Sequence, residues 1–297
     1  MAIDPIKVSD RIEDEYRSYL RSSFPIADPD LNRDFDRQLQ GEFPLTKGPL
    51  LEATPPYEAG ACIRDLVEEG VLSRGFLDFS EEALPLDRPL YLHQEQALRR
   101  ATNGRNLLIA TGTGSGKTEC FLLPIVDALL REREAGTLAR PGVRALLLYP
   151  MNALANDQLK RLRALLKDLP EITFGRYTGE TLQTTKKAER DFHARYPGVN
   201  RLRNELISRD EINEAPPQIL LTNYAMLEYL LLRPSDSSLF DGEFGNHWRF
   251  LALDEIHVYG GSAGTEIGFL LRRLRERVLR DSGKRFQCFG TSATLGD

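Results

Sequence analysis

Six short apolar runs, each of about the length of a β-strand, recur between residue 106 and residue 290 of this 297-residue chain. Helical segments separate most of the runs. This alternation predicts an α/β fold with a mostly parallel sheet that is covered on both faces. Because ligands of parallel sheets bind beyond the carboxyl ends of the strands, the residues that follow each run are candidate functional residues. The runs are NLLIA (106–110), VRALLLY (143–149), ITFGRY (172–177), QILLT (218–222), RFLAL (249–253) and RFQCFG (285–290).

The first run leads into a glycine-rich segment, TGTGSGKTE, at residues 111–119. A strand, a glycine loop and a following helix are typical of a P-loop, whose backbone N–H groups turn toward phosphate oxygens. In such a loop Lys117 reaches the β and γ phosphates of ATP and Thr118 ligates Mg²⁺. Thr111 stands where the usual pattern has its first glycine, and a glycine-rich turn without a ligand is the alternative. The candidate ATP-binding residues are Thr113, Gly114, Ser115, Gly116, Lys117 and Thr118.

The run RFLAL is followed at once by two acidic residues, Asp254 and Glu255, and then by His257. A site for Mg²⁺ and a nucleotide needs one carboxylate for the water shell of the metal and another to polarise the attacking water. We assign the first role to Asp254 and the second to Glu255. A solvated acidic strand end is the alternative, but the upstream P-loop favours the catalytic assignment.

Gln94 lies near the start of the helix expected before the first strand. Its carboxamide offers both a donor and an acceptor, which recognition of the adenine edge requires. Alone it would be interpreted as a surface glutamine, but its position upstream of the P-loop makes it a candidate for binding the base.

These elements, in this order, resemble the first motor domain of superfamily 2 helicases of the DEAD/DEAH-box type. The resemblance covers residues 90–297 and implies a RecA-like P-loop domain. Within the superfamily, the chain most resembles the mitomycin repair factor A family and the large helicases of the DISARM and Druantia phage-defence systems. The matching motifs are Gln94 with GSGKT (the Q motif and motif I), YPMNALANDQ (motif Ia), Thr178-Gly179 and LLTNYAML (minor nucleic-acid motifs), Asp254 to His257 (motif II) and Ser292-Ala293-Thr294 (motif III).

The resemblance also implies roles for individual residues. It implies that His257 lies near the hydroxyls of Ser292 and Thr294, where the three couple the nucleotide state to the strand-binding surface. The catalytic residues that it implies are Lys117, Asp254, Glu255 and His257, with Mg²⁺ at Thr118 and Asp254. The residues that it implies for contacts with the phosphodiester backbone of one strand are Pro150, Asn152, Thr178, Gly179, Thr222 and Asn223.

Residues 1–89 contain short helical patterns joined by proline-containing turns, and no catalytic motif. The expected helices cover 8–20, 31–39 and 57–72. This front part carries 10 Lys and Arg against 19 Asp and Glu, whereas residues 90–297 carry 29 against 25. The mildly basic body is compatible with a polyanionic partner. We expect a helical accessory segment at 1–89 and a RecA-like ATP-binding domain at 90–297.

Two segments of the body are locally basic. Seven Lys and Arg face three Asp and Glu between Lys186 and Arg209, and LLRRLRERVLR at 270–280 holds five arginines. Single charge runs usually mark solvated faces, so we favour that interpretation for both. An electrostatic path for nucleic acid is the alternative.

The N-terminus has no signal-peptide pattern, and no apolar run approaches the length of a membrane span, so we expect a cytoplasmic protein without membrane contact. In motif Ia, Asn152 and Ala153 stand where DEAD-box proteins carry a basic and an acidic residue. This departure favours DNA over RNA as the partner.

The resemblance implies a second RecA-like domain, in this chain or in a partner chain, which supplies arginine fingers for ATP hydrolysis. We therefore expect the N-terminal half of an ATP-dependent DNA helicase or translocase, as part of a longer or split motor, with a role in DNA repair or phage defence. Alone it should hydrolyse ATP poorly. The alternatives are a non-catalytic half-motor that binds nucleotide or nucleic acid and regulates a partner chain, an RNA helicase, and a subunit of a restriction-type translocase.

Overall fold

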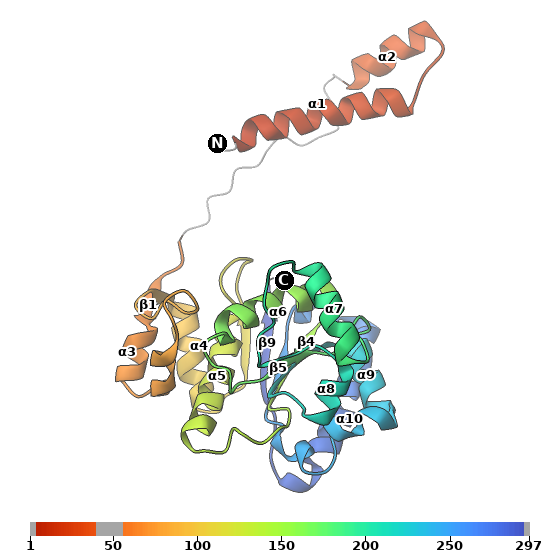
Figure 1. The fold of residues 1–297 in the computed structure, drawn as a ribbon. Helices are drawn as coiled ribbons and strands as arrows, with labels where there is room; N and C mark the ends of the chain where they lie inside the picture. The colour runs from red at the N-terminus through yellow and green to blue at the C-terminus, as the bar shows by residue number, and fades with distance from the viewer. Residues whose placement is uncertain (1–3, 40–55, 294–297) are drawn as a thin grey trace. The chain divides into compact units, whose positions relative to one another are not determined.

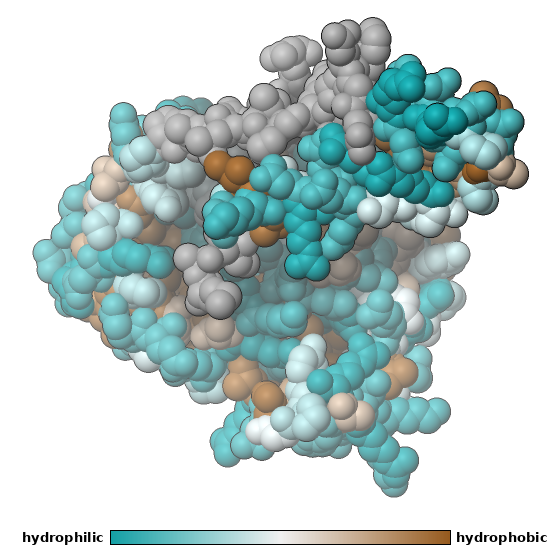
Figure 2. Space-filling view, turned by 90° about the horizontal axis from the view of Figure 1, so that it is seen from above, coloured by the Kyte–Doolittle hydropathy of each residue, from teal (hydrophilic) through white to brown (hydrophobic). Residues whose placement is uncertain are grey.

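The computed structural model of the protein describes residues 4–39 and 56–293. The chain divides into two compact units, Met1–Pro56 and Tyr57–Asp297. No described helix is both long enough and apolar enough to cross a membrane. In the space-filling view (Figure 2), hydrophilic residues dominate the visible surface and hydrophobic residues form small scattered spots.

The first unit contains two helices, α1 (Pro5–Ser23) and α2 (Pro29–Leu39). Asp4 caps α1 by accepting hydrogen bonds from the backbone N–H groups of its first turn, and Asp28 does the same for α2. Arg21 Nε donates to Asp36 Oδ1 at 2.6 Å and joins the two helices. The helices expected at 8–20 and 31–39 are therefore confirmed.

The second unit is built on a seven-stranded sheet with the order β3-β9-β8-β4-β7-β5-β6 (Figure 1). Every pairing in this sheet is parallel. The α/β fold with a mostly parallel sheet is confirmed, and all six predicted strands are present. The strands are β3 (Leu107–Ala110), β4 (Ala145–Tyr149), β5 (Phe174–Arg176), β6 (Glu205–Leu206), β7 (Ile219–Asn223), β8 (Phe250–Leu253) and β9 (Gln287–Ser292).

Helices cover both faces of the sheet and create two large hydrophobic cores, beside a small cluster of Ala97, Ile109 and Cys120. Side chains alternate along β4, so that Leu147 packs with α5 and α6 in one core and Leu146 packs with α9 and α10 in the other. The helices of this unit are α3 (Ile63–Glu68), α4 (Leu92–Thr102), α5 (Glu119–Glu134), α6 (Asn152–Leu166), α7 (Thr185–Arg195), α8 (Arg209–Glu214), α9 (Tyr224–Leu232) and α10 (Gly261–Leu279). Short 3₁₀ helices occur at Arg74–Asp78, Pro234–Leu239, Phe244–His247, Ile256–Val258 and Arg280–Ser282.

Residues 57–89 belong to the same compact unit as the sheet, whereas the sequence suggested a boundary after residue 89. Leu66 and Phe76 are fully buried in the core that contains α5. Apolar packing therefore ties this segment to the unit that contains the sheet.

The helix expected at 57–72 is wrong over its first part. Residues Ala59–Cys62 form β1, which pairs with β2 (Pro89–Tyr91) in an antiparallel ribbon. Glu95 on α4 accepts a hydrogen bond from the backbone N–H of Ala61 at 2.7 Å. These partners lie far along the chain, and the local sequence pattern gives no sign of them.

Asn204 fixes the turn between α6 and β5. It is 2% exposed, and its Nδ2 lies within 3.0 Å of the carbonyl oxygens of Leu166, Leu169 and Ile172. These carbonyls follow the end of α6, where helical partners run out. One buried amide group therefore satisfies three backbone acceptors.

We expect Asn204→Ala to lower the free energy of unfolding by about 1–3 kcal/mol, because it removes three buried hydrogen bonds, although the carbonyls of Leu166 and Leu169 keep a backbone donor. The measurement is urea unfolding followed by the emission of Trp248, the single tryptophan of the chain, which is 2% exposed. Asn246→Ala, which removes one exposed amide bonded to the Gly242 carbonyl, is the matched control and should change stability by less than about 0.5 kcal/mol. Equal effects of both substitutions would contradict the role of Asn204.

Candidate active site

The glycine-rich loop connects the carboxyl end of β3 to α5. Gly114 and Gly116 have φ values of 77° and 74°, a region that favours glycine. Lys117 Nζ donates to the carbonyl oxygens of Thr111 at 2.9 Å and Gly112 at 3.0 Å. The ammonium group is thus folded back over the loop.

Thr111, at the unusual first position of the loop, has a local structural role. Its Oγ1 lies 2.6 Å from Ser115 Oγ, so the two hydroxyls share a hydrogen bond across the turn. Ser115 is fully buried. In this chain the hydrogen bond between Thr111 and Ser115 therefore stabilises the turn, at the position where the usual P-loop pattern has a glycine.

Gln94 is buried, with 6% of its surface exposed, so it is not a surface glutamine. Its Oε1 accepts from the Tyr91 N–H at 2.9 Å, and its Nε2 donates to the Gly116 carbonyl at 3.1 Å. His93 Nε2 lies 2.9 Å from the Ser115 carbonyl oxygen. The start of α4 therefore holds the P-loop through two neighbouring side chains.

A cavity of about 600 Å³ opens beside the loop, in the size range of small-molecule sites. Gln94, Gly114, Gly116, Arg88 and Arg161 are among the residues that line it. Its position next to the P-loop makes it the candidate pocket for the base and the ribose.

Asp254 and Glu255 lie at the carboxyl end of β8. Asp254 is 9% exposed, and its Oδ1 accepts hydrogen bonds from Thr291 Oγ1 and from the Glu255 N–H. Glu255 has a φ of 51° and is the only non-glycine residue in the described ranges with a positive φ. Such strained backbone often occurs at functional sites.

His257 joins the acidic segment to β9. Its Nδ1 lies 3.1 Å from Ser292 Oγ and 3.2 Å from Glu255 Oε2, and only the first contact has hydrogen-bond geometry. The structure thus brings His257 and Ser292 together, as the sequence suggested. Thr294, the other hydroxyl expected there, lies outside the described residues.

Two tyrosines with buried hydroxyls near Asp254 were not foreseen. Tyr149 ends β4 and Tyr259 follows the motif at Asp254, and neither hydroxyl has a hydrogen-bond partner among the described residues. Burial raises the pKa of both phenols, and the negative charge of Asp254 raises it further. Both therefore stay neutral. The strand-end rule could have identified Tyr149.

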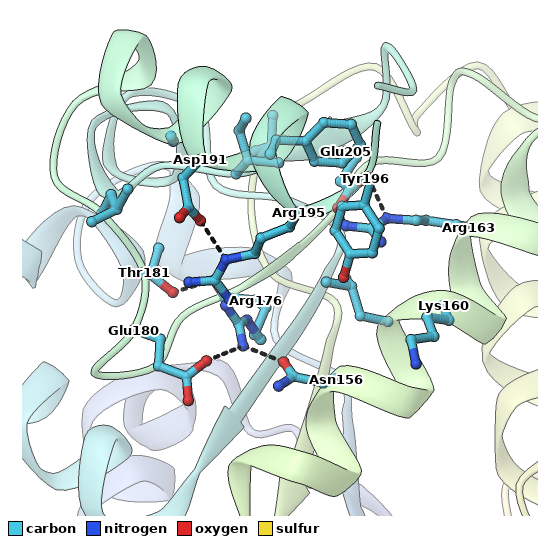
Figure 3. Close-up of a pocket in the computed structure, with 16 residues that line it drawn as sticks. Asn156, Lys160, Arg163, Arg176, Glu180, Thr181, Asp191, Arg195, Tyr196 and Glu205 are labelled. Carbon is cyan, nitrogen blue, oxygen red and sulfur yellow. Dashed lines mark hydrogen bonds and ion pairs between the residues drawn. The ribbon is translucent and has the colours of Figure 1, made fainter. Parts of the chain in front are cut away.

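The edge formed by the carboxyl ends of β4, β7 and β5 carries a chain of polar side chains. Asn223 Nδ2 donates to Asn152 Oδ1 at 2.7 Å, and Asn152 Nδ2 donates to Glu180 Oε1 at 3.2 Å. Arg176 Nη1 donates to Glu180 Oε2 at 2.9 Å and also to Asn156 (Figure 3). The Arg176 guanidinium is the main cause that lowers the pKa of Glu180.

The other expected strand contacts differ in exposure. Gly179 is exposed and Pro150 is partly buried. Thr178 and Thr222 are fully buried, and Thr222 Oγ1 donates to the Tyr177 carbonyl at 2.6 Å. Their side chains therefore do not reach the surface in this structure. Asn152 and Asn223 are the expected polar contacts that do.

A cavity of about 220 Å³ lies beside this edge, between α6, α7 and β5 (Figure 3). Arg163 makes two hydrogen bonds to the buried Glu205, at 2.7 and 2.8 Å, and its guanidinium lies over the rings of Phe192 and Tyr196. Arg195 pairs with Asp191 at 2.8 Å. The arginines of this wall are therefore already paired, which agrees with a structural role.

Comparison with known proteins identifies the family. Residues 91–297 match the family model described as DEAD/DEAH box helicase. The Druantia protein DruE of Escherichia coli (strain UMEA 4076-1) is 32% identical, over 96% of this chain and 20% of that protein. An uncharacterized ATP-dependent helicase of Methanocaldococcus jannaschii is 31% identical, over 69% of this chain and 26% of that protein. The chain thus spans about a quarter or less of the length of these relatives.

Solved structures show the same fold. The DUF1998 helicase MrfA bound to DNA and AMPPNP superposes with a TM-score of 0.58 and 24% identity, over 82% of this chain and 28% of that chain. The DEAD-box helicase Mss116 bound to ssRNA and UDP-BeF gives a TM-score of 0.57 and 18% identity, over 82% of this chain and 42% of that chain. The RecA-like fold is therefore confirmed. With a family model that matches most of its length, the chain belongs to the DEAD/DEAH box helicase family.

Proposed function

We propose that this chain is the N-terminal motor half of an ATP-dependent DNA helicase or translocase, with the RecA-like ATP-binding domain at residues 90–297. One observation carries the proposal: the strand order separates two sets of groups along a single edge. One set lies at the ends of the adjacent strands β3, β9 and β8 and consists of the P-loop, Ser292 and Asp254, respectively. The other set lies at the ends of β4, β7 and β5 and consists of Asn152, Asn223 and Gly179, respectively.

The loop and the acidic segment fit Mg²⁺ and ATP. Lys117 would exchange the carbonyls of Thr111 and Gly112 for phosphate oxygens. The Thr118 hydroxyl and the Asp254 carboxylate would hold the metal, which neutralises charge on the phosphates. The buried, unpartnered hydroxyl of Tyr149 supports this fit, because it is a neutral donor in the neighbourhood of Asp254.

Glu255 is the candidate general base. Its Oε2 is buried, without a hydrogen-bond partner among the described residues, and lies 3.2 Å from His257 Nδ1. In this position Glu255 would orient the attacking water and accept its proton. Through its direct contact with Ser292 on β9, His257 would couple the state of the nucleotide to that strand.

Asn152 and Asn223 would bind the phosphodiester backbone of one strand. Short amide side chains position a strand without reading its sequence, as translocation requires. The MrfA structure contains DNA, which supports DNA over RNA. The likeness to DruE supports a role in phage defence, and the greater length of the relatives supports a second RecA-like domain beyond this segment.

We expect Lys117→Ala to weaken ATP binding by about tenfold to a hundredfold, because charge-assisted hydrogen bonds to phosphate are lost. Calorimetric titration of ATP into residues 1–297 measures the effect. The control Lys167→Ala removes a lysine that pairs with Glu82 on the surface, and it should leave the affinity unchanged. Unaltered binding in Lys117→Ala would exclude the P-loop assignment.

Glu255→Gln should retain ATP affinity and lower strand-stimulated ATP hydrolysis by about 10²–10⁴-fold, the usual contribution of a general base. The assay needs a chain that includes the second motor domain, with DNA and RNA compared as the stimulating strand. Vigorous strand-stimulated hydrolysis by residues 1–297 alone would contradict the need for arginine fingers. Stimulation by RNA alone would favour the RNA-helicase alternative.

Asn223→Ala should weaken binding of a short single strand by about fivefold, the effect of one lost hydrogen bond, and leave ATP binding unchanged. Fluorescence anisotropy with an 8-nucleotide labelled DNA tests this. Asn213→Ala removes an amide that binds Asp236 away from this edge and serves as the control. If both variants bind the strand like the parent chain, Asn223 does not contact it.

A further inference from the structure

The opposite edge of the sheet, where the strands begin, is basic at three neighbouring strands. Arg144 precedes β4, Arg249 precedes β8, and Lys284 and Arg285 lie just before β9. Backbone hydrogen bonds join these starts: the Arg249 N–H donates to the Arg144 carbonyl at 3.0 Å, and the Gln287 N–H donates to the Arg249 carbonyl at 2.9 Å. The fold thus gathers cations from distant parts of the chain.

Two cavities open along this edge and share part of their lining. One has a volume of about 690 Å³ and is lined by Arg140 and Arg249 among others. The other has a volume of about 940 Å³ and is lined by Arg272 of α10. Lys284 and Arg285 line both. We call Arg140, Arg249, Arg272, Lys284 and Arg285 the basic edge.

The five residues of the basic edge are exposed and form no ion pair within the described parts of the chain. The acids that line the cavities are already paired: Glu132 with the buried Arg144 at 3.0 Å, and Glu276 with Arg275 at 2.6 Å. Among the side chains that the structure describes, the five cations therefore have no acidic partner in an ion pair.

Most other arginines of the basic segments differ in this respect. On α10, Arg273 pairs with Glu228 at 2.8 Å and Arg277 pairs with Asp241 at 2.6 Å. In the segment from Lys186 to Arg209, Arg201 pairs with Glu211 at 2.6 Å. For these ion-paired arginines we keep the interpretation as solvated or structural side chains. The unpaired cations of the basic edge need a different explanation.

The pKa of His247 reflects the charges around it at this edge. Its pKa is lowered first by burial and then by the positive charges of Arg144, Arg140 and Lys284, against a raising effect of Glu132. A side chain within the 690 Å³ cavity therefore experiences a net positive environment.

We propose that the basic edge binds the phosphodiester backbone of a nucleic-acid segment that lies outside the motor cleft. Five single cations spread over two connected cavities suit a ligand with repeated negative charges better than one compact anion. Trp248, which lines the 690 Å³ cavity, is 2% exposed and offers no free ring for a base, and Phe286 in the 940 Å³ cavity is partly buried. Because the edge consists mainly of cations, we expect it to contact phosphates of the nucleic-acid backbone without recognising the base sequence.

The proposed segment differs from the strand at Asn152 and Asn223, because parallel strands place their two ends on opposite edges of the sheet. Flanking duplex is the form of nucleic acid that we assign to the basic edge, because its two strands present phosphates more densely than a single strand does, and five separated cations suit such an array. This inference rests on the proposed function as a DNA motor and adds a second contact to it.

The test is fluorescence anisotropy of residues 1–297 with a labelled 30-base-pair DNA duplex over a salt series. The triple variant Arg272→Ala, Lys284→Ala, Arg285→Ala should bind at least about tenfold more weakly at 50 mM salt. The slope of log K against log salt should fall by about 2–3, since each lost phosphate contact contributes about 0.9. The control variant Lys7→Ala, Arg11→Ala, Arg33→Ala removes the same charge from exposed, ion-paired residues and should leave the affinity and the slope unchanged.

The two sets of variants distinguish a failure of this proposal from a failure of the proposed function. Asn223→Ala should weaken binding of the 8-nucleotide single strand but not of the duplex, and the triple variant should do the reverse. An unchanged duplex affinity and salt slope in the triple variant would overturn the basic edge as a nucleic-acid site, whatever the outcome for ATP. If polyglutamate competes as strongly as unlabelled DNA at equal charge, the nucleic-acid proposal is wrong and an acidic protein surface is the better ligand. Arg272→Ala alone, with Trp248 emission as the folding check, should give a slope change of about 1.

Discussion

The pairing of β4 with β8 on one side and β7 on the other is the constraint on which the site depends. Its register sets Leu148 opposite both Leu253 and Thr222, so the segments that follow all three strands emerge at one edge. The Asp254 N–H donates to the Leu148 carbonyl at 3.0 Å, which extends the pairing into the acidic segment. A slip of this register would separate the Asp254 carboxylate from Tyr149 and from the asparagines on the neighbouring strands.

The same sheet explains how one domain can connect two ligands. The groups proposed for the nucleotide and those proposed for the strand lie at the ends of neighbouring strands, and β8 and β9 are linked at these ends by the contacts of His257 with Glu255 and Ser292. Because a packed parallel sheet is stiff, a change at one strand end is passed on through such side chains more readily than through the buried strands themselves.

The sequence predicted the elements that local pattern determines. The six strands have apolar runs long enough to recognise, and the P-loop is specified within one stretch between β3 and α5. Strand β6 has only two residues, and β1 depends on Pro89–Tyr91, so neither could be found locally. The burial of Thr178 and Thr222 depends on the direction of each side chain at a paired strand end, which the sequence motif does not specify. The basic edge combines residues 140, 249, 272 and 284–285, which only the fold brings together.

The bonds from Lys117 to the Thr111 and Gly112 carbonyls have a thermodynamic consequence. The loop is already closed on itself, so ligand binding trades existing hydrogen bonds for new ones and orders few additional dihedral angles. Much of the entropic penalty of organising a phosphate cradle is then met during folding and not during each encounter with ATP. The proposed motor would release its nucleotide in every cycle and would benefit from this arrangement, because recognition is retained while net affinity stays modest.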